Sequence, residues 1–253
     1  MKLQLILAYD GTNYCGWQAQ ENGKSVQETV TAAACELYCR ECLVTGCSRT
    51  DSGVHARAYS CTVQFADGAG EGIDSVIPVA AVPRAMNAKL PEDIAVTNAI
   101  VVSDDFHPRY GVKSKTYEYV MYDSPVRSPF MRGRAYHVRL ISDASLSAMD
   151  MAAKAMCGKR DFAAFMASGS RIEDTVRTVY ECSVRRDGEN IIFRVSADGF
   201  LYKMVRTMAG TALAVGGGRL RADDISDIIE SKDRSCAGAT LPAEGLYLCE
   251  VRY

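Results

Sequence analysis

The sequence lacks three features that would set it apart from ordinary globular proteins. It has no low-complexity tract, and hydrophobic residues make up 48% and charged residues 24% of its 253 positions, so we expect a folded globular chain. It has no apolar run approaching the ~20 residues that a membrane span needs. Its first apolar stretch is broken by Gln4 and closed by Asp10, too soon for a secretory signal. We therefore expect a cytoplasmic protein.

An excess of basic charge is also missing. The formal net charge is -2, so a nucleic-acid partner would have to bind a local basic surface rather than the chain as a whole. The 10 cysteines are scattered, and without a secretory signal we expect reduced thiols. Cys39 and Cys42 form a lone C-x-x-C and, with Cys35, follow the spacing of one helix. No second C-x-x-C or His pair follows, which favours small buried side chains over structural zinc.

The first half alternates strand and helix signals. Ser25 and Glu28 form a capping box, and the apolar spacing after them predicts a helix over residues 26–41. Every second residue from Tyr59 to Phe65 is apolar, which predicts a strand over 58–65. Further strands are predicted at 3–9 and 94–102. A weaker helical signal at 76–89 is interrupted by Pro78 and Pro83.

The second half repeats this order. Alternation from Lys115 to Met121 predicts a strand, and 146–156 is an Ala- and Met-rich helix candidate. Asp187 and Gly188 separate two strand-like runs, 176–186 and 190–197, and so predict a hairpin. The remaining predicted elements are a helix beginning at Phe200 and stopping at 216–218, an acidic helix with a solvated face at 223–233, and a last strand at 246–253.

Each half therefore follows approximately the order β-α-β-β-α-β, the ferredoxin-like or split βαβ arrangement, in which an antiparallel sheet carries its helices on one face. We predict an α+β fold with two such lobes, residues 1–104 and 105–253, and a central catalytic cleft between them. No residue-level repeat accompanies the duplication, so it rests on the pattern of elements alone.

A short polar loop lies between the first predicted helix and the strand at 58–65. Residues 46–56 are dense in Gly, Ser, Thr and Asp. Composition alone favours a turn in which Asp51 and Ser52 hydrogen-bond their own backbone. The alternative is that Arg49 and Asp51 point outward on a constrained loop to meet a ligand.

A second candidate cluster opens the helix near residue 200. If Met204 and Met208 point inward, Arg206 is drawn partly toward the core and needs a carboxylate partner there. Asp51 is a candidate for that partner. The alternative is a solvated arginine on the outside of the helix.

Tyr117 shares its predicted strand face with Tyr119 and Met121, where it could be an ordinary core aromatic. Its surroundings are unusual in charge, because residues 109–139 hold seven basic residues against two acidic ones, with six aromatics between them. The basic residues are Arg109, Lys113, Lys115, Arg127, Arg132, Arg134 and Arg139. Basic groups neutralise phosphates and aromatic faces stack on unpaired bases, so the segment indicates an RNA with an accessible loop or a flipped nucleotide.

Five segments, in order and covering most of the chain, resemble the TruA family of tRNA pseudouridine synthases. They are YDGTNYCGWQ at 9–18, RTDSGVHA at 49–56, KTY at 115–117, FLYKMVR at 200–206 and GLYL at 245–248. The sequence departs from the family's usual pattern at three positions, where Ser48 replaces Gly, Ser52 replaces Ala and Thr207 replaces Asn. Ser48 is the one that could alter loop geometry.

The resemblance implies a homodimer that acts on uridines at positions 38 to 40 of the tRNA anticodon stem-loop, without a metal or an organic cofactor. It implies that Asp51 is the nucleophile, Tyr117 the aromatic that stacks against the target base, and Arg206 the basic partner of the aspartate. Arg49 matches the residue that helps to extrude the base. The other substrate-binding residues expected within the matched segments are Thr50, His55, Lys115 and Leu246.

These residue types suit the reaction. Isomerisation breaks the bond from N1 to C1′, rotates the uracil and joins C5 to C1′, so a carboxylate nucleophile is sufficient. Attack at C6 and assistance at C1′ both remain open for Asp51, and the C5 proton could leave to Asp51 or to the Tyr117 hydroxyl. Arg206 would keep Asp51 ionised. Flipping the uridine costs a few kcal/mol, which stacking and phosphate contacts must offset.

Two other functions compete with this one. Asp10-Gly11-Thr12 after the first strand suggests an aspartyl-phosphate phosphotransferase of the haloacid dehalogenase type, but that motif is D-x-D-G-T and position 8 is Ala8. A non-catalytic RNA-binding protein would explain the basic aromatic segment. It would not explain Arg49, Asp51 and Arg206.

Overall fold

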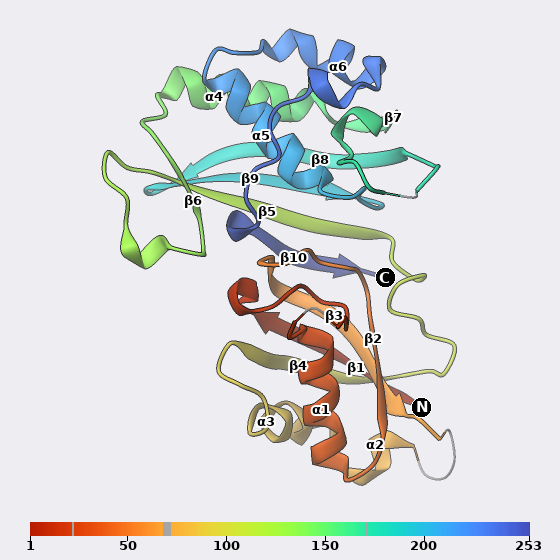
Figure 1. Ribbon diagram of the computed structural model, residues 1–253. Helices are drawn as coiled ribbons and strands as arrows, with labels where there is room; N and C mark the ends of the chain where they lie inside the picture. Colours follow the sequence, from red (N-terminus) through yellow and green to blue (C-terminus); the bar gives the residue numbers. More distant parts are fainter. Residues whose placement is uncertain (22, 68–71, 171) are drawn as a thin grey trace. The chain divides into compact units, whose positions relative to one another are not determined.

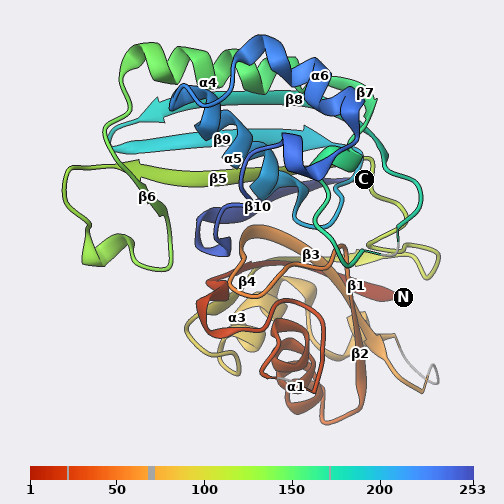
Figure 2. The same ribbon diagram turned by 45° about the horizontal axis from the view of Figure 1, so that its top comes forward.

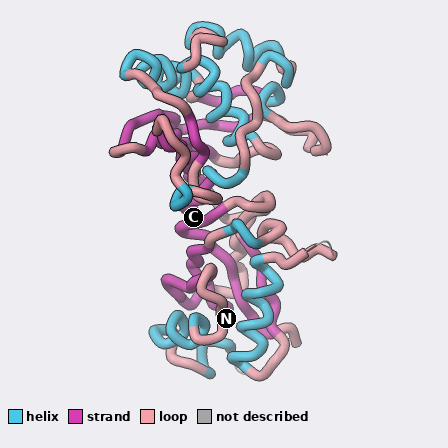
Figure 3. Tube along the Cα trace, turned by 60° about the vertical axis from the view of Figure 1, so that its left-hand side comes forward, coloured by secondary structure: helices cyan, strands magenta, loops and turns pink. Residues whose placement is uncertain are grey.

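The computed structural model describes residues 1–21, 23–67, 72–170 and 172–253, and the chain divides into two compact units. The first unit comprises Met1–Lys113 and Leu248–Tyr253, and the second comprises Ser114–Tyr247. Each unit mixes helices and strands (Figure 1), and within each they occupy separate regions (Figure 3). The predicted α+β class is confirmed. Among the residues in these ranges, no helix has the length and apolar character that a membrane crossing requires.

The sheet of the first unit has the strand order β4-β1-β3-β10, and β2 pairs with β3. The strands are β1 (Lys2–Tyr9), β2 (Cys42–Gly46), β3 (His55–Phe65), β4 (Ile94–Val102) and β10 (Leu246–Arg252), the last contributing its final five residues to this unit. Strand β1 runs antiparallel to both β3 and β4, and β2 is antiparallel to β3. The side chains of Leu3, Leu5 and Leu7 are fully buried, as the period-two pattern requires when one face covers a core.

The main helix of this unit is α1 (Val26–Tyr38), and it begins at the predicted capping box. The Ser25 hydroxyl accepts from the Glu28 N–H at 3.2 Å, and the Glu28 carboxylate accepts from the Ser25 N–H at 3.1 Å. The helix ends before residue 41, because Cys39 adopts φ +49 in the left-handed region. Cys42 lies on β2 instead. The expectation that Cys35, Cys39 and Cys42 share one helix is therefore wrong.

The weak helical signal at 76–89 corresponds to separate short helices. Helix α2 (Ile73–Val76) ends before Pro78, a 3-10 turn follows at Val79–Ala81, and α3 is Val82–Asn87. Pro83 occupies the first turn of α3, where a missing N–H breaks no helical bond. The predicted interruption by proline is confirmed.

The sheet of the second unit has the strand order β5-β9-β8-β7 with antiparallel neighbours, and a short β6 pairs parallel with β5. The strands are β5 (Ser114–Asp123), β6 (Tyr136–Val138), β7 (Gly158–Asp161), β8 (Val176–Asp187) and β9 (Asn190–Ala197). The helices are α4 (Asp143–Ala155), α5 (Met204–Gly216) and α6 (Ile225–Ser231), and all three lie on the same side of this sheet (Figures 1 and 2).

Most of the elements predicted in this half are present. The hairpin turns at Gly188 with φ +61, as the Asp-Gly signal predicts. Helix α5 starts four residues later than Phe200, because Lys203 takes a left-handed conformation with φ +58 and ends the turn before it. Helix α6 lies in the acidic run, and its other face buries Ile225, Ile228 and Ile229. The parallel β6 was not predicted.

Candidate active site

Asp51 lies in the loop that joins β2 to β3. Its side chain is half-buried, and the neighbouring Arg49 is exposed. The Val54 N–H donates to the Asp51 carbonyl at 3.2 Å, which closes a tight turn, and Gly53 in that turn has φ +78. The loop is therefore a compact turn with Asp51 at its start.

The segment 9–18 holds this loop in place. The Trp17 N–H donates to the Thr50 carbonyl at 3.3 Å, and the Gly53 N–H donates to the Tyr14 carbonyl at 3.3 Å. The Ser52 hydroxyl also donates to the Tyr14 carbonyl, at 3.1 Å. The expected bond from Ser52 to its own backbone is thus replaced by one to a distant segment.

Two glycines make this contact possible. A β-carbon on Gly11 would lie 2.0 Å from the Val54 carbonyl oxygen, and one on Gly16 would lie 2.3 Å from the Thr50 carbonyl oxygen. Neither distance can be tolerated between a β-carbon and backbone. Both glycines fall within the YDGTNYCGWQ motif, but the sequence pattern gives them no role of their own. Their role is to let backbone pack directly on the Asp51 loop.

Three aromatic side chains lie beneath the start of the loop. The Tyr59 hydroxyl hydrogen-bonds both the carbonyl and, at 3.3 Å, the N–H of Ser48. Trp17 stacks on the Tyr59 ring with centroids 4.0 Å apart, and the Tyr9 hydroxyl contacts the Thr50 hydroxyl at 3.1 Å. Burial raises the pKa of Tyr59 well above its ordinary value, so the phenol stays protonated and remains a donor to the loop.

His55 lies at the other end of the loop, where only 1% of its surface is exposed. Its Nδ1 accepts from the Gly11 N–H at 3.0 Å. The same nitrogen lies 3.2 Å from Asp10 Oδ1. The Asp10 carboxylate also accepts from the N–H and hydroxyl of Thr12. In this position His55 secures the turn after β1.

Tyr117 and Lys115 lie on β5 in the second unit. Tyr117 is opposite Val195 of β9, and its buried ring meets Phe200 edge-on with centroids 5.1 Å apart. Lys115 is opposite Ala197 and is half-buried. The two side chains share one strand face, because they are two residues apart.

Arg206 lies in the first turn of α5 between the fully buried Met204 and Met208, and it is half-buried as predicted. Its Nε donates to the Leu241 carbonyl at 2.7 Å, and the Leu241 N–H donates to the Arg206 carbonyl at 3.2 Å. The backbone bond fixes Leu241 beside the helix, and the Leu241 carbonyl in turn orients the guanidinium of Arg206. Thr207 is one of the departures from the family pattern. Its hydroxyl lies 2.9 Å from that of Thr240, so it also holds α5 against the segment that contains Leu241.

Leu246 is the first residue of β10 and is buried. Just before it, a β-carbon on Gly245 would lie 2.6 Å from the Val120 carbonyl oxygen and 2.8 Å from the Tyr119 ring. Glycine at 245 therefore lets the chain approach β5 closely enough to seat Leu246. Gly245 belongs to the GLYL segment, but the sequence pattern does not show that a glycine is required there for the chain to approach β5.

The predicted site residues divide between the two units. Arg49, Thr50 and Asp51 lie on one loop of the first unit, and His55 begins the strand β3 that follows it. Lys115, Tyr117, Arg206 and Leu246 belong to β5, α5 and β10 in the second unit. Within the described ranges, no group of three or more His, Cys, Asp or Glu side chains is placed to hold a metal ion.

Comparison with known proteins defines the class. A family model described as tRNA pseudouridine synthase matches residues 5–111 and 152–253. The chain therefore belongs to the tRNA pseudouridine synthase family, and it is an isomerase that acts on uridine in tRNA.

Within that family the chain is similar to TruA proteins over its whole length, and the resemblance found in the sequence is confirmed. It is 44% identical to tRNA pseudouridine synthase A of Ruminiclostridium cellulolyticum over 100% of this chain and 99% of the relative. It is 43% identical to the enzyme of that name from Acetivibrio thermocellus over 99% of both chains. A chain of a solved Cbf5-Nop10-Gar1 complex aligns with a TM-score of 0.37 and 14% identity, over 83% of this chain and 44% of that one.

Proposed function

We propose that the chain converts uridine to pseudouridine at positions 38, 39 and/or 40 of the tRNA anticodon stem-loop. In this proposal Asp51 is the nucleophile, Tyr117 stacks against the target base, and Arg206 is the basic partner of Asp51. The observation that carries the proposal is the similarity to tRNA pseudouridine synthase A over the full chain. The backbone contacts that fix the Asp51 turn support it, because a reacting group must be held in position.

The proposed reaction needs no external reagent. The bond from N1 to C1′ breaks, the uracil rotates, a bond from C5 to C1′ forms, the C5 proton is lost and N1 gains a proton, so that the product is an isomer of the substrate. Asp51 acts either by attack at C6 or by assisting elimination at C1′. Either route requires an ionised carboxylate, which a nearby guanidinium favours. The proton leaves C5 to a base, Asp51 or the Tyr117 hydroxyl.

The other proposed site residues bind and expose the uridine. Arg49 fills the space that the flipped base leaves, and its exposed side chain suits that role. Thr50, His55, Lys115 and Leu246 complete the binding surface. Flipping costs a few kcal/mol, so stacking on Tyr117 and phosphate contacts from the basic segment 109–139 must offset it.

We also propose the architecture and setting that accompany this function. The fold would comprise two split βαβ lobes, residues 1–104 and 105–253, and it is supported by the β4-β1-β3 order with β2 beside β3 in one unit and by the β5-β9-β8 order in the other. The enzyme would be a cytoplasmic homodimer that uses neither a metal nor an organic cofactor. These features come from the resemblance to TruA proteins.

The test uses tRNA transcripts carrying uridine tritiated at C5. We expect the purified protein to release tritium from transcripts with a uridine at one of the positions 38, 39 and 40, and to release none when all three positions are cytidine. Release from uridines elsewhere in the transcript would contradict the proposed positions. No release from any transcript would contradict the proposed activity.

A further inference from the structure

The segment between β5 and α4 leaves the body of the second unit as a long loop and returns to it (Figures 1 and 2). We define the arm as residues 124–140. It contains four arginines and no acidic residue, in a chain with a net charge of -2. It also lies between the two ranges that the family model matches.

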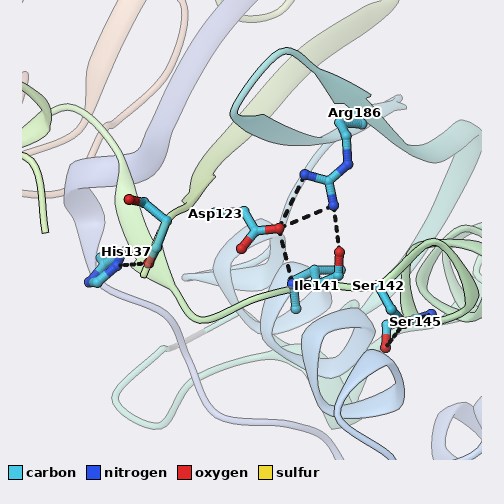
Figure 4. A network of polar contacts seen from close by, with 7 residues as sticks. Asp123, His137, Ile141, Ser142, Ser145 and Arg186 are labelled. Carbon is cyan, nitrogen blue, oxygen red and sulfur yellow. Dashed lines mark hydrogen bonds and ion pairs between the residues drawn. The ribbon is translucent and has the colours of Figure 1, made fainter. Parts of the chain in front are cut away.

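An ion pair and its hydrogen bonds, which we call the clamp, join the two ends of the arm. Asp123, just before the arm, accepts through Oδ2 from the N–H of Ile141, just after it, at 3.0 Å. Both terminal nitrogens of Arg186 donate to the same oxygen at 3.1 Å, and Nη2 also donates to the Ile141 carbonyl at 2.5 Å (Figure 4). The carboxylate is buried, so the pair is largely shielded from water. The two ends of the arm are therefore held together by β8.

The base of the arm is fixed by packing as well. Ala135 forms a buried cluster with Val120 and Tyr122 of β5, and Met131 packs against that cluster. The Tyr122 hydroxyl accepts from the Ser128 N–H at 3.2 Å. In addition, His137 stacks on the Tyr122 ring with centroids 4.7 Å apart, and the Tyr247 hydroxyl donates to the Arg134 carbonyl at 2.7 Å. The arm is consequently an ordered projection with a defined outer face.

That outer face combines exposed apolar and basic groups. Phe130 is 87% exposed and Val126 is 73% exposed. Arg127 and Arg132 are exposed beside them in the sequence. These side chains contribute nothing to the core, and together with the arginines they leave an apolar and basic face available to a partner.

We propose that the arm is a docking surface for the substrate tRNA, in which Arg127 and Arg132 bind backbone phosphates and Phe130 stacks on an exposed base or sugar. The inference rests on the proposed function for its choice of RNA. Charge favours RNA as the partner, because a polyanion complements an arm that has four arginines and no carboxylate, whereas contact between the arms of two copies would bring like charges together. Asp123 and Arg186 are positioning residues, since they act only by holding the arm.

The first test removes the charges of the arm. The double variant R127A/R132A should raise the Kd for a tRNA transcript roughly tenfold and flatten its dependence on salt. At transcript concentrations well below KM, tritium release should fall by a factor similar to the loss of affinity. The matched control is R185A/R221A, which removes two exposed arginines that pair with Asp187 and Asp223 outside the arm, and it should bind like the wild type. F130A should weaken binding with little effect on the salt dependence.

The second test releases the clamp. R186M keeps much of the side-chain volume but leaves Asp123 without its guanidinium partner, so it should raise KM while the variant stays folded by circular dichroism. Combined with R127A/R132A, it should add little, because the arm's contacts are already lost. R186K, which retains one charged donor, should recover part of the affinity.

The outcomes separate this inference from the proposed function. If the wild type releases no tritium from any transcript, the proposed function fails whatever the arm does. If the wild type is active and R127A/R132A binds the transcript as tightly as the control, the arm is not a docking surface for RNA. If F130A turns the protein from dimer to monomer by light scattering and leaves the affinity of the remaining dimer for RNA unchanged, the arm binds a second copy, and the inference is overturned.

Discussion

The α-carbon of Gly16 lies so close to the carbonyl of Thr50 that a β-carbon at position 16 would stand 2.3 Å from that oxygen. Gly16 also has φ +108, a conformation open mainly to glycine. The turn after β1 and the loop before β3 therefore fit together only because residue 16 has no side chain. This contact ties the backbone on one side of Asp51 to a segment more than 30 residues earlier in the sequence.

Gly16→Ala should lower both stability and activity. The left-handed φ and the clash with the Thr50 carbonyl together should cost about 3 kcal/mol of unfolding free energy. Because the clash displaces the residue before Asp51, tritium release should fall by more than the loss of folded protein explains. Urea denaturation and the activity per folded molecule measure the two effects.

Gly169→Ala is the control for this substitution. Gly169 has φ +89, but a β-carbon added to it would meet no atom within 4 Å, so only the backbone strain of about 1 kcal/mol applies. Its activity per folded molecule should equal that of the wild type. Equal losses for the two alanine variants would mean that contact with Thr50 is unimportant.

Tyr59→Phe should loosen the start of the Asp51 loop. The substitution keeps the ring that stacks on Trp17 and removes the hydroxyl that bonds both backbone groups of Ser48. We expect a loss of about 1 to 2 kcal/mol in unfolding free energy and a lower kcat with an unchanged Kd for tRNA. Hydrogen exchange of the Ser48 amide should become faster, and unchanged exchange would count against the role of the hydroxyl.

Thiol labelling should follow burial. Burial raises the pKa of the Cys61 and Cys182 thiols, and both side chains are buried, whereas Cys39 and Cys236 are exposed. At pH 7.5 a maleimide should therefore modify Cys39 and Cys236 within minutes and the two buried thiols only after unfolding. Mass spectrometry of peptides from native and denatured samples measures this order. Rapid labelling of Cys61 in the native protein would contradict the packing around β3.

Asp161→Asn should destabilise the second unit in a pH-dependent way. The hydrogen bond from Lys232 to Asp161, at 2.8 Å, and the one from Thr175 hold the pKa of this carboxyl below its ordinary value of 3.8. A lowered folded-state pKa contributes stability that is present above the unfolded pKa and is lost as the pH falls through the folded value. The variant should be about 1 kcal/mol less stable at pH 7.

The difference between Asp161→Asn and the wild type should shrink as the pH falls below about 3.8. Lys232→Met isolates the contribution of the ion pair, because it leaves the bonds from Thr175 and the Ala163 N–H to Asp161 intact. Thermal denaturation from pH 2.5 to 7 measures all three proteins. A difference that stays constant over that range would show that ionisation of Asp161 contributes no stability.

Elements fixed by local patterns could be predicted from the sequence. The capping box at Ser25, the Asp-Gly hairpin at 187–188 and the alternation along β5 each depend on residues a few positions apart. The three-residue β6 depends instead on pairing with β5 in the folded unit, and no three-residue pattern is specific enough to reveal it. The end of α1 was also missed, because a left-handed residue that ends a helix is usually Gly or Asn and this one is Cys39.

The candidate site was only partly visible in the sequence. Composition favoured an ordinary turn around Asp51, and the resemblance to TruA proteins, rather than spacing, singled out that residue. The contacts that hold the loop run from Tyr14 and Trp17, which are more than 30 residues away. Such long-range contacts depend on how β1 and β3 pair, so they follow from the fold and not from any local motif.

The assignment of Asp51 as the nucleophile is tested most directly by Asp51→Asn, which keeps the size of the side chain and removes its charge. We expect this variant to bind the tRNA transcript within about threefold of the wild-type Kd and to release tritium from C5 at least ~1,000 times more slowly. Asp187→Asn, which alters an exposed carboxylate in the hairpin of the second unit, should be fully active. Release by Asp51→Asn at the wild-type rate would contradict the account.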